Sequence, residues 1–91
     1  MRIRWTQAAA ADLQHISDHL KDHHPHYRQP TIRKLYDAIR SLKASPHRGR
    51  PGREEATREL VFSPLPYVAV YRVTGQSIEV LRIYHGAQDR P

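Results

Sequence analysis

The chain has 91 residues, which is enough for one domain and too short for two. Lysine and arginine total 15 against 9 acidic residues, so the formal net charge is +6 and the surface should attract phosphate groups or an acidic protein. The absence of cysteine excludes a disulfide scaffold and a thiolate metal site, and no run approaches the roughly 18 apolar residues of a membrane span. We therefore expect a single cytoplasmic domain over residues 1–91, with no membrane association.

The first part of the chain predicts a short strand and a helix. Residues 3–5 (IRW) read as the start of a strand, and Thr6 is a suitable N-cap for the alanine-rich segment that follows. We expect this helix to run from about Gln7 to Asp22. Its apolar residues recur at helical spacing and form one stripe: Ala9, Leu13, Ile16 and Leu20.

A second helix is expected after an interruption at residues 23–30 (HHPHYRQP). The two prolines of this stretch predict a break or an irregular first turn. Two amphipathic helices joined by a short polar link form an antiparallel hairpin, and each helix needs a surface that covers its apolar stripe. The stripe of the second helix lies within residues 31–45 and consists of Ile32, Leu35, Ile39 and Leu42.

The rest of the chain predicts a loop and three strands. Residues 45–57 contain proline, glycine and charged residues without periodicity, so they should form a loop. Three runs rich in Val, Ile, Tyr and Phe follow, namely RELVF, YVAVYRV and SIEVLRIYH, with short breaks typical of antiparallel neighbours. Because the runs are nearly continuous, much of both sheet faces should be covered. The expected fold is α+β, in the order β-α-α-β-β-β, with a helical hairpin packed on a mainly antiparallel sheet.

Several of these segments together resemble toxins of the RelE/ParE superfamily, the small proteins of type II toxin–antitoxin systems. The resemblance rests on WTQAAAADLQHI near the start, GRPGREEATREL in the middle, and YVAVYRV and VLRIYHGAQDRP at the end. It implies a bacterial growth inhibitor held inactive by a cognate antitoxin, which we expect to be acidic and partly disordered. ParE-like members bind and poison DNA gyrase, whereas RelE-like members bind the ribosome and cleave mRNA. We expect no cofactor for either activity.

Metal-free RNA cleavage needs groups that transfer protons and cations that hold the phosphate. The candidate catalytic residues for this chemistry are His85, Arg82 and Tyr84, and His85 stands where some ribosome-dependent nucleases carry a catalytic histidine. Arg82 and Tyr84 are two residues apart and should share one face of their strand, while His85 should point to the other side. Glu54 or Glu55 would supply a carboxylate base.

Two departures from the nucleases favour the gyrase-binding branch. Val68 stands where those nucleases usually carry an arginine, and a valine cannot hold a phosphate. The strand TRELVF lacks the lysines of the RelE type, and the ending HGAQDRP is closer to ParE-like proteins. We therefore expect gyrase inhibition, with mRNA cleavage as the alternative. The candidate contacts with the target or the antitoxin are arginines of the loop and strands: Arg48, Arg50, Arg53, Arg58 and Arg72.

The arginines and the tyrosine also have structural interpretations. Arg58, Arg72 and Arg82 can each pair with a carboxylate, such as Glu59 or Glu79, or with the antitoxin. The tyrosine at position 84 can serve as a sheet aromatic with its hydroxyl in water. These interpretations stay open beside the functional ones.

The histidines suggest a metal site, and the charge suggests nucleic acid. His19 and His23 form an i, i+4 pair that could chelate zinc, but no metalloprotease motif surrounds them, so we expect no metal site. A small basic nucleic-acid-binding module is a third class of function. The sequence lacks the helix-turn-helix pattern, the stacking aromatics and the zinc motif of such modules.

Overall fold

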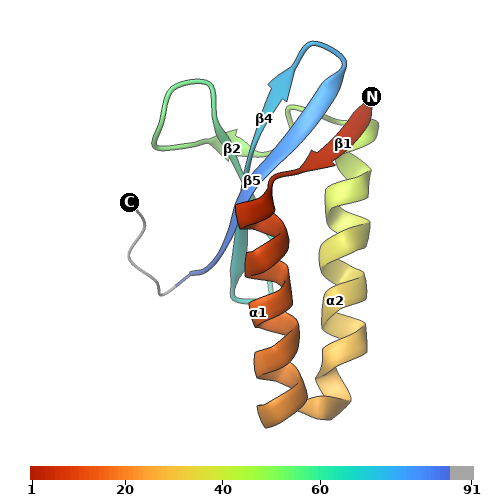
Figure 1. The fold of residues 1–91 in the computed structure, drawn as a ribbon. Helices are drawn as coiled ribbons and strands as arrows, with labels where there is room; N and C mark the ends of the chain where they lie inside the picture. Colours follow the sequence, from red (N-terminus) through yellow and green to blue (C-terminus); the bar gives the residue numbers. More distant parts are fainter. Residues whose placement is uncertain (87–91) are drawn as a thin grey trace.

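The structure, a computed structural model, describes residues 1–86, which form two layers (Figure 1). A pair of antiparallel helices makes one layer and a sheet makes the other. The expected α+β fold is confirmed, with a two-residue strand added inside the segment predicted as a loop. Within residues 1–86 the elements are β1 (Arg2–Trp5), α1 (Gln7–His23), α2 (Pro25–Arg40), the 3-10 turn η1 (Ser41–Lys43), β2 (Arg50–Pro51), β3 (Arg58–Val61), β4 (Tyr67–Thr74) and β5 (Ser77–His85).

The sheet has the strand order β1-β5-β4-β3-β2 within the described residues. β1 pairs with β5 in parallel, and the other neighbours pair antiparallel. The first and last strands of the described chain therefore lie side by side. Beyond Trp5, where β1 ends, the edge of β5 instead forms hydrogen bonds with Thr6 and with Asp12 of α1.

Thr6 caps α1, as predicted. Its side-chain oxygen accepts a hydrogen bond from the amide of Ala9 at 3.1 Å, which satisfies a donor that the helix itself cannot. The amide of Thr6 donates to the carbonyl of Val80, and its hydroxyl donates to the carbonyl of Leu81. The cap residue thus attaches the first turn of α1 to the edge of β5.

The second helix begins earlier than predicted. α2 starts at Pro25, so the link between the helices is His24 alone. Proline suits this first position because the amide there has no partner inside the helix, and Pro30 removes only one bond of the helical ladder. Neither α1 nor α2, within residues 1–86, is both long enough and apolar enough to cross a membrane.

The core lies between the helices and one face of the sheet. Both predicted helical stripes contribute to it, and Leu35, Leu42 and Tyr71 are fully buried. The other face, which we call the open face, is covered only in part, so the expectation of two largely covered faces was only half right. Val68 and Glu59 are buried on the open face, but Arg72 is exposed there.

A β-bulge decides which side chains of β5 reach the open face. Val70 pairs with Arg82 but Tyr71 pairs with Val80, so Leu81 has no partner on β4. In a regular strand Arg82 would point toward the helices, in line with Val80. The extra residue instead turns Arg82 to the open face and leaves Ile83, which is 3% exposed, in the core.

Candidate functional site

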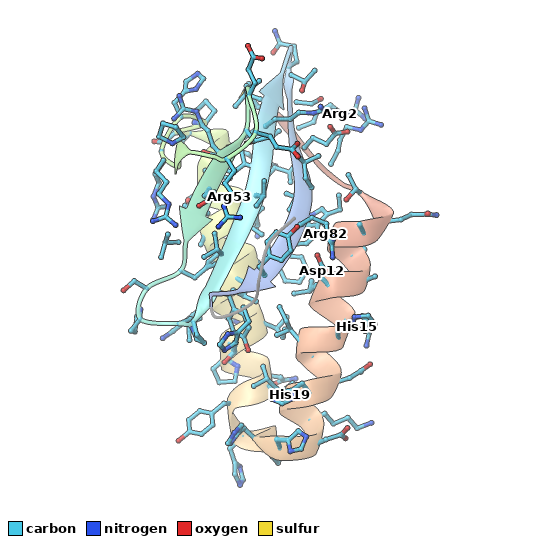
Figure 2. The ribbon with its side chains drawn as sticks, turned by 90° about the vertical axis from the view of Figure 1, so that its left-hand side faces the viewer. Arg2, Asp12, His15, His19, Arg53 and Arg82 are labelled. Carbon is cyan, nitrogen blue, oxygen red and sulfur yellow. The ribbon has the colours of Figure 1, made fainter. Side chains whose placement is uncertain are left out.

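Arg82 is held by an ion pair with the first helix. Its Nε lies 2.8 Å from Oδ2 of Asp12, and its Nη2 lies 3.0 Å from Oδ1. Oδ2 of Asp12 also accepts a hydrogen bond from the amide of Ile83 at 2.9 Å, at the part of the β5 edge that β1 does not reach. Figure 2 shows Asp12 on α1 beside Arg82. The hydrogen bond raises the pKa of the Arg82 guanidinium and occupies N–H donors that a phosphate would otherwise use.

Replacing Asp12 with alanine should lower the free energy of unfolding by about 1–3 kcal/mol. The amide of Ile83 loses its acceptor, and the half-exposed Arg82 adds a smaller loss. Urea denaturation measures the change. Asp18→Ala is the control, because it removes only an exposed hydrogen bond from Gln14 and should cost less than about 0.5 kcal/mol. Equal midpoints for the two variants would contradict the expected role of Asp12.

Arg82 and Tyr84 share a face, as predicted, and line one cavity of about 240 Å³ on the open face. The guanidinium carbon of Arg82 lies 5.2 Å from the centre of the Tyr84 ring. Glu54, one of the two carboxylates suggested as a base, is among the lining residues. The cavity therefore combines guanidinium, carboxylate and aromatic groups over an apolar floor. Its other lining residues are Arg53, Thr57, Glu59, Val70 and Leu81.

His85 lies at a different cavity, of about 300 Å³, which it shares with α1. Its ring meets the Tyr67 ring edge-on at 5.7 Å, and burial raises the pKa of the Tyr67 hydroxyl. The structure thus brings Arg82 together with Tyr84 but not with His85. His15 and His19 line the cavity of His85, a grouping that the sequence reasoning missed although their i, i+4 spacing was visible.

Two of the histidines at the end of α1 lie close together. The rings of His19 and His23 lie 4.5 Å apart. No set of three or more His, Asp or Glu side chains in residues 1–86 is placed to hold a metal ion.

Among the candidate contact arginines, Arg50 and Arg72 form ion pairs with glutamates. Arg50 donates to Oε1 of the buried Glu59 from both Nε and Nη2, at 3.1 and 2.9 Å. Arg72 donates to Glu79 at 2.7 Å across the β4–β5 pair. One of the ion pairs considered from the sequence, between Arg72 and Glu79, is therefore observed. Glu59, the other carboxylate considered, pairs with Arg50.

The other three arginines belong to residues 46–57, here called the basic loop, or to its base. Arg58 donates to the carbonyls of His47 and Gly49, at 3.1 and 2.7 Å. Arg48 donates to the hydroxyl of Ser41. Arg53 lines the open-face cavity, and Figure 2 shows it over that face of the sheet.

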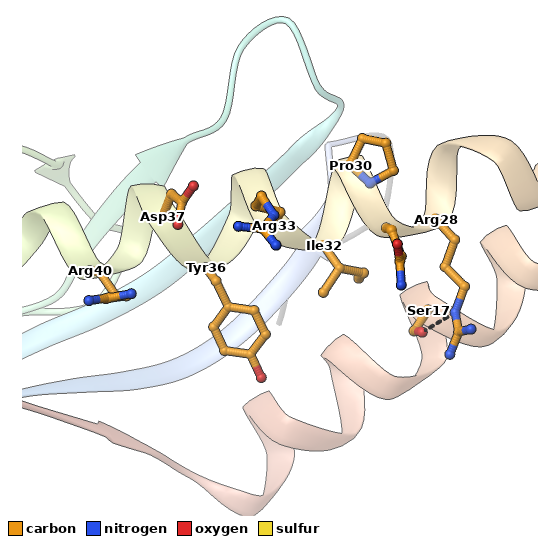
Figure 3. A pocket seen from close by; sticks show the side chains of 9 residues that line it. Ser17, Arg28, Pro30, Ile32, Arg33, Tyr36, Asp37 and Arg40 are labelled. Carbon is orange, nitrogen blue, oxygen red and sulfur yellow. Dashed lines mark hydrogen bonds between the residues drawn. The ribbon is translucent and has the colours of Figure 1, made fainter.

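A groove between the two helices was not predicted. Two adjoining cavities, of about 740 and 360 Å³, share Ser17, Ile32 and Tyr36, and we call them together the hairpin groove. The rings of Tyr36 and Trp5 are 5.6 Å apart. Arg28 donates a hydrogen bond to the hydroxyl of Ser17 at 2.9 Å (Figure 3). The remaining lining residues are Ala10, Leu13, Gln14, Gln29, Pro30, Arg33, Asp37 and Arg40. The groove is therefore apolar along its floor and mainly cationic along α2.

Comparisons with known proteins agree with this architecture. The chain matches the family model of the ParE toxin of the type II toxin-antitoxin system, parDE, over residues 3–90. It is 34% identical over 90 residues to Y4kP of Sinorhizobium fredii, covering 99% of this chain and 93% of that protein. It is 37% identical over 87 residues to Toxin RelE2 of Caulobacter vibrioides, covering 96% and 97%.

A solved structure of similar fold supports the same assignment. The structure described as the chromosomal ParDE TA system from P. aeruginosa matches with a TM-score of 0.84 at 32% identity, covering 93% of this chain and 95% of that one. Sequence and fold agree over nearly the whole length. The chain therefore belongs to the ParE toxin family of type II toxin–antitoxin systems.

Proposed function

We propose that this toxin acts in the cytoplasm by binding DNA gyrase and trapping it on cleaved DNA. The observation that carries the choice of target is the separation of the candidate nuclease residues. Arg82 is bound to Asp12, and His85 lines a different cavity from Arg82 and Tyr84. General acid–base cleavage of RNA needs the proton-transfer group and the phosphate-holding cation around one reacting centre. A toxin that acts by surface contact has no such requirement.

Expression without an antitoxin tests the proposal. The wild-type chain should arrest growth with filamentation and a DNA-damage response, and the purified protein should raise the amount of cleaved DNA bound to gyrase. His85→Ala should inhibit growth to within about twofold of wild type, whereas loss of a catalytic acid or base would reduce cleavage by about 10²–10⁴-fold. A folded His85→Ala protein that no longer inhibits growth would overturn the proposal.

The alternative is a ribosome-dependent mRNA endonuclease. Two observations favour it: the 37% identity to Toxin RelE2, and the cavity that joins Arg53, Glu54, Arg82 and Tyr84. Primer extension on cellular mRNA after expression distinguishes it. Cuts at codon boundaries with intact gyrase activity support the nuclease, and intact mRNA supports the gyrase proposal.

The antitoxin implied by family membership is proposed to occupy the hairpin groove. Ile32 and Tyr36 offer apolar contacts, and Arg28, Arg33 and Arg40 line the same groove. An acidic, amphipathic segment that orders on binding would match both features, and the net charge of +6 would speed its capture. A substitution in the groove should therefore weaken antitoxin binding.

A further inference from the structure

We propose that the buried hydroxyl of Tyr71 sets the shape of the basic loop, and that this loop is the surface that contacts the target of the toxin. The loop would then serve the target and the hairpin groove would serve the antitoxin. This inference rests on the proposed function in that it assumes a toxin acting by contact. It assigns a positioning role to a core residue that does not itself reach the target.

The Tyr71 hydroxyl ties together two points of the loop. Tyr71 is fully buried, yet its hydroxyl donates to the carbonyl of Pro46 at 2.7 Å and accepts from the amide of Gly49 at 2.9 Å. Both are backbone groups, so the hydroxyl fixes the path of the chain rather than a side chain. A buried phenol that lost these partners would leave polar groups unsatisfied. The start of the loop is therefore held from inside the core.

Hydrogen bonds also fix the base of the loop, at Arg58, and its last part, residues 52–57. Arg58 donates to the carbonyls of His47 and Gly49. The amide of Gly52 donates to the carbonyl of Thr57 at 2.8 Å, and the Thr57 hydroxyl donates to the carbonyl of Glu54 at 2.6 Å. The loop is thus hydrogen-bonded at its start, base and end, although it contains only a two-residue strand.

The loop exposes three arginine side chains at its surface. Arg48, Arg50 and Arg53 are exposed, and the side chain of Arg50 keeps 57% of its surface accessible while it pairs with Glu59. Figure 1 shows the loop projecting from the sheet to one side of the helical layer. Among the residues that line the hairpin groove in the described chain, none comes from the loop. A surface ordered in advance loses less conformational entropy on binding, so its shape contributes to affinity.

Tyr71→Phe tests this because it keeps every charge and the aromatic ring and removes only the anchoring hydroxyl. Hydrogen exchange at the Gly49 amide should become at least about tenfold faster, and growth inhibition should need about tenfold more toxin. Both changes are of the size expected when one hydrogen bond to an ordered group is lost. Affinity for the purified antitoxin should stay within about twofold. Tyr67→Phe is the matched control, since it removes the hydroxyl of another buried tyrosine of β4, one that is not among the residues lining the hairpin groove.

The outcomes separate the inference from the proposed function. Faster exchange with undiminished growth inhibition would show that the loop is not the target surface, and unchanged exchange would show that Tyr71 is not its anchor. Weaker antitoxin binding with full growth inhibition would assign the loop to the antitoxin instead. Growth inhibition by a wild-type chain that leaves gyrase unaffected would overturn only the gyrase target. If Tyr71→Phe does not fold, Thr57→Val removes the side-chain hydrogen bond to the carbonyl of Glu54 with no change of charge, and it should weaken growth inhibition in the same direction.

Discussion

Replacing Gly49 with alanine is expected to lower the free energy of unfolding by about 2–4 kcal/mol, combining overpacking with a weakened hydrogen bond. A Cβ at this position would lie 2.8 Å from the carbonyl oxygen of Glu59 and 2.8 Å from Cε1 and the hydroxyl of Tyr71. Neither neighbour can retreat easily, since one is backbone in β3 and the other is a fully buried side chain. The substitution therefore pushes the basic loop off its anchor. For a domain of this size the melting temperature should fall by roughly 10–25 °C.

Thermal and urea denaturation check this expectation, with Gly75→Ala as the control. Gly75 has a positive φ of 56°, but nothing lies within 4 Å of the position that a Cβ would take, so alanine there meets only backbone strain of about 1–2 kcal/mol. Comparing the stability losses of the two variants separates the effect of close packing at Gly49 from the effect of backbone conformation at Gly75. A Gly49→Ala protein at least as stable as Gly75→Ala would show that the loop is not closely packed against Tyr71.

The second large effect is expected at the hairpin groove. Tyr36→Ala should weaken antitoxin binding by about 2 kcal/mol or more, which is roughly thirtyfold, because an aromatic anchor at the centre of an interface contributes strongly. Tyr36 is 44% exposed in the free toxin and its ring lies near that of Trp5, so it presents a large surface at little ordering cost. Isothermal titration calorimetry with the purified antitoxin measures the loss. In cells, the same variant should remain toxic when the antitoxin is co-expressed at a level that protects from wild type.

Tyr27→Ala is the matched control for the groove. Tyr27 also belongs to α2 and is 65% exposed, but it is not among the residues that line the groove. Its replacement should leave antitoxin affinity within about twofold. Circular dichroism must show that both variants are folded. Equal affinities for the two variants would place the antitoxin elsewhere on the toxin.

Sequence reasoning was most successful where structure depends on neighbours along the chain. The cap at Thr6, the helix from Gln7 and the two apolar stripes follow from side-chain chemistry and the 3.6-residue period. It was less successful at residues 23–30, where the two prolines suggested a break or an irregular first turn. Pro25 is the first residue of α2, a position that tolerates proline, and Pro30 lies inside the helix. The two-residue β2 was missed because Arg50 and Pro51 pair only with a strand that comes later in the chain.

The geometry of the candidate site could not be predicted from local sequence patterns, because it depends on contacts between distant elements. The shared face of Arg82 and Tyr84 was predicted correctly from their spacing, but the choice of face required the bulge at Leu81, which appears only when β5 pairs with β4. The hairpin groove likewise needed both helices in place.

By itself, the sequence determined the fold class, the helical cap, the basic charge and the resemblance to a toxin family, because each depends on residue type and short-range spacing. Only the tertiary structure decided that Arg82 binds Asp12, 70 positions away, that His85 faces a separate cavity, and that Tyr71 holds Gly49. These pairings form between residues distant in the chain. Their geometry is set by the register of the sheet and the position of α1 on its edge, neither of which a local pattern encodes.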